Sequence, residues 1–260
     1  MNELVLLVVL ALSACAKRVP PPRVPQAPVV EQKPAPAPAI EHDDGMQLEG
    51  QLGTLSGEDI AGVFKTRWPD VMRCSRSAQD KLYYLHGTVQ LKLRIGADGA
   101  AAKAYVEHST LGSWAAEQCV LAVARSLVFP APKGGKEAEF SYPIEVRARR
   151  PAPIVDWDEA RVAPTVLRSK HDVGVCRGDV PPGPHRKHVQ RVQRVAPTVL
   201  PANLHVTMYV APGGHVSSVG LAGEGPIDDA FAACLLTHAL TWKVDDPRGH
   251  IAKASFPVTQ

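Results

Sequence analysis

The fold is decided by residues 87–108, which read GTVQLKLRIGADGAAAKAYVEH. In the first half of this stretch every second residue is apolar: Val89, Leu91, Leu93 and Ile95. A two-residue period predicts a strand with one buried and one solvated face. Residues 96–99, Gly-Ala-Asp-Gly, are typical of a hairpin turn, so we expect a return strand over residues 102–108.

A helix is predicted before this hairpin. Ser56 can cap its first turn, and the acids Glu58 and Asp59 suit the positive end of the helix dipole. Apolar residues then recur at the spacing of one helical face: Ile60, Val63, Phe64, Trp68, Val71 and Met72. Pro69 lies inside this pattern and predicts a kink or a break near Trp68.

A second helix and a third strand complete the unit. The helix is expected over residues 113–127, where Pro130 and Pro132 end it, and the strand over residues 137–146. The order of elements is therefore α-β-β-α-β, which predicts an α+β fold.

The second half of the chain repeats the first. A displacement that places Cys119 on Cys234 superposes three further pairs without a gap: Gly99 and Gly214, Pro132 and Pro247, and Gly134 and Gly249. A register held across several elements favours a duplicated unit. We expect one unit over residues 55–150 and a degenerate copy over residues 151–260, in which Pro164 interrupts the first helix.

The N-terminus predicts a lipoprotein signal peptide over residues 1–14. The apolar run from Leu4 to Leu12 is far shorter than the roughly 20 residues of a membrane-spanning helix and matches the core of an export signal. Leu12-Ser13-Ala14-Cys15 then reads as a lipobox, in which Cys15 is acylated and becomes the mature N-terminus. We expect attachment to the outer membrane through this lipid alone, with the protein facing the periplasm.

A proline-rich linker is expected over residues 15–54. It contains eight prolines between Pro20 and Pro38, which prevent helix and sheet formation and favour extended polyproline II. We expect a disordered spacer between the lipid anchor and the folded part.

Four cysteines remain once Cys15 is assigned to the lipid: Cys74, Cys119, Cys176 and Cys234. An even number in an oxidising compartment predicts two disulfides, and spacing alone leaves all pairings open. If the two halves are duplicates, each closes its own bridge, Cys74 to Cys119 and Cys176 to Cys234. No two cysteines have the close spacing of a zinc site, so we expect no metal ion and no cofactor.

The net charge of +3 shows no broad electrostatic surface for nucleic acid. Basic residues gather only in two clusters: Arg147, Arg149 and Arg150, and Arg186 and Lys187. We interpret both clusters as solvated connectors, and the alternative is contact with an anionic polymer or lipid surface. His185 and His188 flank the second cluster, whose positive charge disfavours a metal ion there.

Three tryptophans, Trp68, Trp114 and Trp242, have the helical spacing of core residues. Trp157 differs, because it lies in a polar connecting segment, where it either joins the two units or contributes to a contact surface. The chain has no Gly-x-Ser-x-Gly elbow, no Walker loop and no His-Glu-x-x-His helix, so we expect no enzyme.

Several short matches connect the first unit to a known family. They are residues 55–60 (Leu-Ser-Gly-Glu-Asp-Ile), Cys74, residues 87–89, the 96–99 turn, residues 109–111, residues 117–119, and the ending at residues 129–132 and 142–143. In these residues the chain resembles the AgmX/PglI C-terminal domain of gliding-motility and envelope proteins, itself similar to the C-terminal domain of TonB. The second half keeps Gly214, Cys234, Pro247 and Phe256-Pro257 but lacks the opening block.

The resemblance implies a periplasmic interaction module with helices packed on a small antiparallel sheet and no catalytic residues. We therefore expect a non-enzymatic lipoprotein that binds an envelope protein, linked to gliding motility or TonB-type systems. The expected mode is strand addition at a sheet edge, over residues 137–146 or 252–258. The alternatives are a structural binder of peptidoglycan or an acidic envelope polymer and, third, an unrecognised hydrolase.

Overall fold

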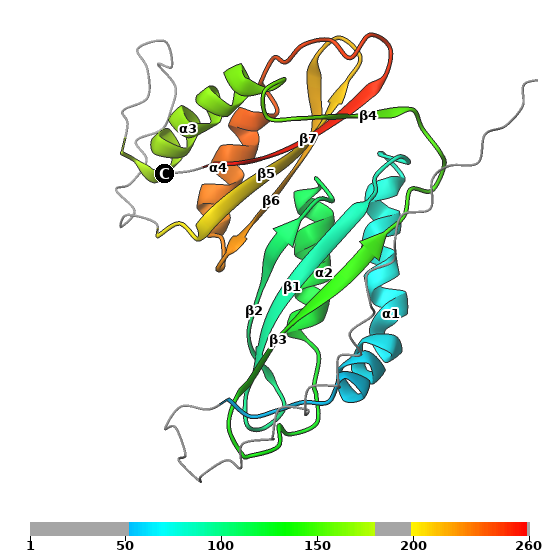
Figure 1. Cartoon of the computed structure of the whole chain (residues 1–260), viewed down its shortest axis with the longest axis vertical. Helices are drawn as coiled ribbons and strands as arrows, with labels where there is room; N and C mark the ends of the chain where they lie inside the picture. Colours follow the sequence, from blue (N-terminus) through cyan, green and yellow to red (C-terminus); the bar gives the residue numbers. More distant parts are fainter. Residues whose placement is uncertain (1–51, 180–198, 259–260) are drawn as a thin grey trace, which may run out of the picture. The chain divides into compact units, whose positions relative to one another are not determined.

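The computed structural model describes residues 52–179 and 199–258 (Figure 1). The predicted signal peptide, Cys15, nearly all of the linker, and Arg186 and Lys187 lie outside these residues. The described part is an α+β fold with four helices and two sheets. Its elements are α1 (Gly57–Gln79), β1 (Gly87–Ile95), β2 (Ala101–Ser109), α2 (Trp114–Arg125), β3 (Ala138–Val146), β4 (Ile154–Trp157), α3 (Ala163–Arg177), β5 (Ala202–Ala211), β6 (His215–Glu224), α4 (Asp229–Ala239) and β7 (Ile251–Pro257).

The α-β-β-α-β order occurs twice, with β4 between the two copies. In the first copy the strands follow the order β2-β1-β3 and all pair antiparallel. In the second copy the order is β4-β7-β5-β6, where β4 is parallel to β7 and the other pairs are antiparallel. We call the copies the first repeat, α1 to β3, and the second repeat, α3 to β7.

One backbone contact recurs in both repeats and supports the duplication. In each repeat a glycine of the hairpin turn accepts a backbone hydrogen bond from a residue that follows the second helix. The N–H of Phe129 donates to the carbonyl of Gly99 (2.9 Å), and the N–H of Val244 donates to the carbonyl of Gly214 (3.1 Å). Both glycines have positive φ angles, 84° and 74°, and a side chain on either would overlap the carbonyl beside it. Glycine is therefore required at the same place in each copy.

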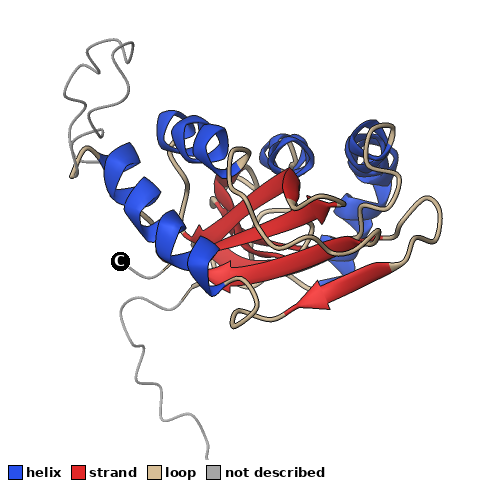
Figure 2. Ribbon diagram, turned by 90° about the horizontal axis from the view of Figure 1, so that it is seen from above, coloured by secondary structure: helices blue, strands red, loops and turns tan. Residues whose placement is uncertain are grey.

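The two helices of each repeat lie on one face of its sheet (Figure 2). The alternating residues predicted to face inward, Val89, Leu91, Leu93 and Ile95, are fully buried. Trp242 is buried as predicted, and Trp114 packs against the core of the second repeat. The prediction for Trp68 is wrong, because its side chain lies at the margin of the buried stripe of α1 and is 37% exposed.

The helix boundaries follow their capping residues. Ser56 Oγ accepts from the N–H of Asp59 (3.1 Å), and α1 continues without a break through Pro69. The prediction that Pro164 interrupts the first helix of the second repeat is wrong, because α3 begins at Ala163 and Pro164 lies in its first turn. Proline is well tolerated there, since the first N–H groups of a helix have no partner within the helix.

The sequence analysis did not predict β4, and it predicted that β7 is an exposed edge strand of its sheet. Residues 154–157 looked like a polar connector, yet they pair with residues 251–254 of β7. As a result β7 lies between β4 and β5, so its predicted role as an exposed edge is incorrect. A four-residue strand has too little periodicity to be recognised without its partner.

Both predicted disulfides are present. Cys74 bonds to Cys119 and joins α1 to α2, while Cys176 bonds to Cys234 and joins α3 to α4. Among the described residues, no helix has the length and apolar character needed to span a membrane.

The disulfides predict the thiol chemistry of the folded part. Alkylation of the denatured, unreduced chain should modify none of Cys74, Cys119, Cys176 and Cys234, and alkylation after reduction should modify all of them. Mass spectrometry of a proteolytic digest measures both states and the linked peptides. A peptide that joins a cysteine of one repeat to a cysteine of the other would contradict the structure.

Candidate functional site

The outer edge of β3 is a nine-residue strand edge without a partner strand in the described part of the chain. Four strands are outermost in their sheets: β2, β3, β4 and β6. Of these, β2 lies beside β6, and β4 has only four residues. β3 has nine residues, and its described partners are β1 and, at its start, Gly53, whose N–H donates to the carbonyl of Glu137 (2.7 Å).

Pro143 shows which backbone groups face outward from β3. The antiparallel register between β1 and β3 runs from Gly87 opposite Val146 to Ile95 opposite Ala138 without interruption. Since proline has no N–H to donate to β1, its nitrogen must face the free edge. Backbone direction alternates along a strand, so the N–H groups of Ser141 and Glu145 also face that edge.

The second repeat shows how this edge can be used. Its last strand, β7, corresponds to β3, and Pro257 corresponds to Pro143. The outer edge of β7 carries β4, paired in parallel from Ile154 opposite Ile251 to Trp157 opposite Ala254. The pairing ends before Pro257, so a short extended segment binds only the donor-bearing part of the edge.

The solvent face of β3 carries paired charges. Glu139 contacts Lys92 (3.2 Å) and Arg94 (3.2 Å), and its hydrogen bond with Lys92 lowers the pKa of the carboxyl. Glu145 contacts Arg147 (3.0 Å), and this hydrogen bond likewise lowers the Glu145 pKa. The described charges on this face are therefore compensated by neighbouring side chains.

A groove of about 500 Å³ lies at the C-terminal end of β3. Its lining includes His86, Thr88, Glu145, Arg147, Ile154 and Asp156. The groove therefore connects the end of the free edge to β4.

Two of the predicted interaction residues in the described part of the chain form ion pairs. Arg147 pairs with Glu145, and Arg149 pairs with Asp80 (2.6 Å). Trp157 lies in β4, where it packs against the second core and beneath the guanidinium of Arg161 at 5.2 Å.

Glu117 is a buried contact between the repeats that the sequence analysis did not identify. It lies in the first turn of α2, is 0% exposed, and has no ion pair among the described residues. Its carboxylate accepts from the hydroxyl of Ser109 (2.7 Å) and from the N–H of Leu221 in β6 (3.1 Å). A side chain at Gly220 would overlap this carboxylate, so the glycine makes room for it.

Burial determines the protonation of Glu117. Desolvation raises the pKa of its carboxyl to about 7, although the hydrogen bonds from Ser109 and Leu221 oppose this change. The side chain therefore titrates inside the contact between the two repeats near neutral pH.

Tyr209 of β5 makes a second contact between the repeats. Its ring is fully buried in the core of the first repeat. Its hydroxyl donates to the carbonyl of His86 (2.8 Å) and accepts from the N–H of the same residue (3.2 Å). Lys253 donates to that carbonyl as well (2.9 Å). Burial raises the pKa of Tyr209 to about 12 and lowers that of Lys253.

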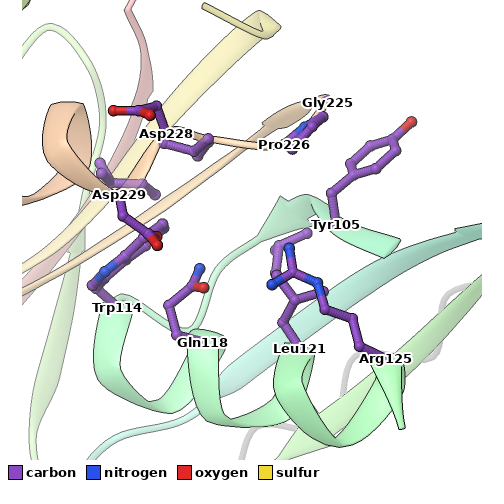
Figure 3. Close-up of a pocket in the computed structure, with 12 residues that line it drawn as sticks. Tyr105, Trp114, Gln118, Leu121, Arg125, Gly225, Pro226, Asp228 and Asp229 are labelled. Atoms are coloured by element: carbon purple, nitrogen blue, oxygen red, sulfur yellow. The ribbon is translucent and has the colours of Figure 1, made fainter. Parts of the chain in front are cut away.

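A smaller pocket, of about 220 Å³, lies between α2 and the turn that leads into α4 (Figure 3). Two of its polar side chains make contacts within the fold. Asp228 caps α4 by accepting from the N–H of Phe231 (2.9 Å), and Arg125 reaches the carbonyl of Ala104 (3.4 Å). Trp114, on the wall of the pocket, packs against the core of the second repeat.

Comparisons with known proteins returned no match: no family model, no curated protein and no solved structure is similar to this chain.

Glu117→Gln tests the buried carboxyl. The folded-state pKa of about 7 lies above the ordinary value of 4.5, so the folded state holds the proton more tightly. The stabilisation from this proton is complete below about pH 4.5 and is lost as the pH rises through about 7, a change of about 3 kcal/mol. Glutamine mimics the protonated acid at both pH values. The free energy of unfolding of the variant, relative to that of the wild type, should therefore rise by about this much between pH 5 and pH 8.

Urea unfolding at the two pH values measures this gain. Glu58→Gln, at an exposed position in α1, is the matched control and should follow the wild type. Parallel profiles for Glu117→Gln and the wild type would show that the carboxyl does not titrate in the buried contact.

Proposed function

We propose that this chain is an envelope lipoprotein without enzymatic activity, anchored to the outer membrane through Cys15, that binds an envelope protein. The two repeats act as modules similar to the AgmX/PglI and TonB C-terminal domains. An extended segment of the partner adds to the free edge of β3, as a strand parallel to β3.

The observation that carries this proposal is the pairing of β4 with β7. The same type of strand, at the same place in the repeat, already holds a short parallel segment in the second copy. Backbone hydrogen bonds provide the affinity in strand addition, and neighbouring side chains provide the selectivity. By correspondence with β4, the partner segment lies opposite residues 137–140, ends next to Ser141, and does not reach Pro143.

The linker fits this role. If the proline-rich residues adopt the expected polyproline II conformation, at about 3.1 Å per residue, they would carry the modules several tens of Å from the membrane. In the periplasm, this reach allows the β3 edge to meet a partner away from the outer membrane.

Photo-cross-linking in cells tests the proposal. A photoreactive amino acid at Ser141, which is exposed beside the free edge, should cross-link to one envelope protein. The matched control is Lys103, which is exposed on the solvent face of β2 in the same sheet, and it should give no such product. Cross-links from Ser141 only to residues before position 52 would show that the linker of the chain itself fills the edge, and the proposal would then be wrong.

A pair of substitutions at Ser141 tests the backbone contact. Ser141→Pro removes an outward N–H and leaves the pairing with β1 intact, so a chain with this substitution and no photoreactive residue should retain at least tenfold less of the partner that cross-linking identifies. Ser141→Ala keeps this N–H and should capture the partner as the wild type does. Equal capture by both variants would mean that β3 does not accept a strand.

A further inference from the structure

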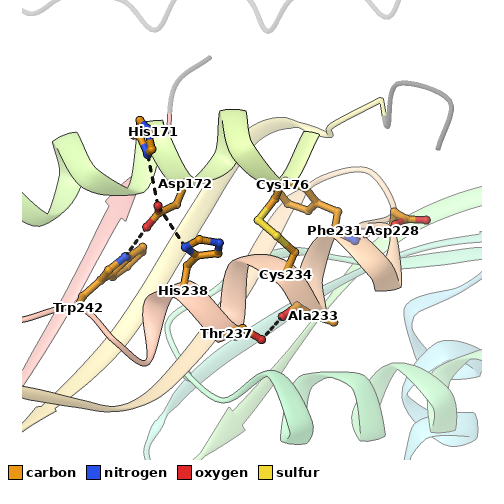
Figure 4. Close-up of a disulfide and its surroundings, with 10 residues drawn as sticks. All are labelled: His171, Asp172, Cys176, Asp228, Phe231, Ala233, Cys234, Thr237, His238 and Trp242. Carbon is orange, nitrogen blue, oxygen red and sulfur yellow. Dashed lines mark hydrogen bonds and ion pairs between the residues drawn. A yellow bond between two sulfur atoms is a disulfide. The ribbon is translucent and has the colours of Figure 1, made fainter. Parts of the chain in front are cut away.

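The fold brings Cys176, Cys234 and His238 together in the second repeat (Figure 4). One ligand atom from each residue lies within 4.8 Å of the other two. Cys234 and His238 are four residues apart and share one face of α4, while Cys176 comes from α3. Sequence spacing did not reveal this group, because Cys176 and Cys234 are 58 residues apart.

Asp172 lies beside the imidazole of His238. Its Oδ1 lies 3.3 Å from Nδ1 of His238, and its Oδ2 accepts from the indole N–H of Trp242 (2.8 Å). Oδ1 also lies 3.5 Å from Nδ1 of His171. The carboxylate side chain is only 8% exposed, so it is a fixed acceptor.

This contact leaves Nε2 of His238 to act as a ligand. The imidazole lies between Asp172 and the pair of sulfur atoms (Figure 4). In zinc sites the second ring nitrogen of a histidine ligand commonly lies beside a carboxylate, which sets the tautomer and strengthens metal binding.

We propose that reduction of the Cys176–Cys234 disulfide creates a binding site for one zinc ion. A dithiol supplies two electrons and two protons, so the disulfide becomes two thiols while the dithiol becomes a disulfide. Zinc then binds the two sulfur atoms and Nε2 of His238, and each thiol releases its proton to solvent. Water occupies the fourth tetrahedral position, as in zinc sites with two cysteines and one histidine.

The first repeat is an internal control. The displacement that places Cys234 on Cys119 places His238 on Val123, which offers no ligand. Asp70 corresponds to Asp172 when Cys74 is placed on Cys176, but it pairs with Arg67 (2.7 Å) and Arg73 (3.0 Å). Reduction of the first disulfide therefore exposes two thiols without a histidine.

Zinc titration of the reduced full chain tests the proposal. The chain is reduced with dithiothreitol, freed of it without oxygen, and titrated with zinc against a chromophoric chelator. The wild type should bind one zinc ion, and cobalt in its place should give the absorption of a tetrahedral thiolate site. The unreduced chain should bind neither ion at this site.

Two variants locate the site. His238→Val, which copies the first repeat, should weaken zinc binding at least tenfold. Asp172→Asn keeps the three ligands and should weaken it by about 10- to 100-fold, as loss of the residue that orients a ligand usually does. A chain with Cys74→Ser and Cys119→Ser should bind as tightly as the wild type.

Far-UV circular dichroism distinguishes loss of the site from loss of the fold. If reduction unfolds the second repeat, zinc should restore its helical signal in the wild type but not in His238→Val. Equal binding by the wild type and His238→Val, binding that depends on Cys74 and Cys119, or no binding by the reduced wild type would each overturn the proposal.

Discussion

The disulfide between the two helices of each repeat is the constraint on which the rest of the structure depends. Each repeat has a core formed by only two helices and one face of a small sheet, and cores of this size are marginal without a crosslink. The bridges Cys74–Cys119 and Cys176–Cys234 hold both helices over the same face. The opposite face and the outer strand edges are therefore left for contacts with other segments.

The outer strands of the two sheets have different neighbours in the described structure. β2 lies beside β6, where Glu117 reaches from α2 to the backbone of Leu221, and β4 covers β7. The outer edge of β3 has no partner strand among the described residues, and Pro143 limits the stretch over which one can add. Of the two corresponding strands, β7 therefore holds a segment of the chain itself, while the outer edge of β3 holds no strand among the described residues.

The sequence predicted those features that depend on local patterns. The period of residues 87–95, the hairpin glycines and the cap at Ser56 correctly placed β1, its turn and α1, and the internal repeat indicated both disulfide pairings. It did not predict features that arise only when distant segments meet. β4 is too short to have a period, Glu117 looked like an ordinary acid at a helix start, and the group around His238 joins two helices.

We propose that the outer edge of β3, which has no partner strand among the described residues, binds a strand of another protein. Hydrogen exchange of single amides, followed by NMR, tests it most directly in the purified full chain before and after addition of the cross-linked partner in purified form. The N–H groups of Ser141 and Glu145 should exchange fast in the chain alone, and those of Tyr142 and Ile144 slowly, because only the latter pair with β1. The partner should slow exchange at Ser141. An amide of Ser141 that is already protected in the chain alone, or that the partner leaves unchanged, would contradict the account.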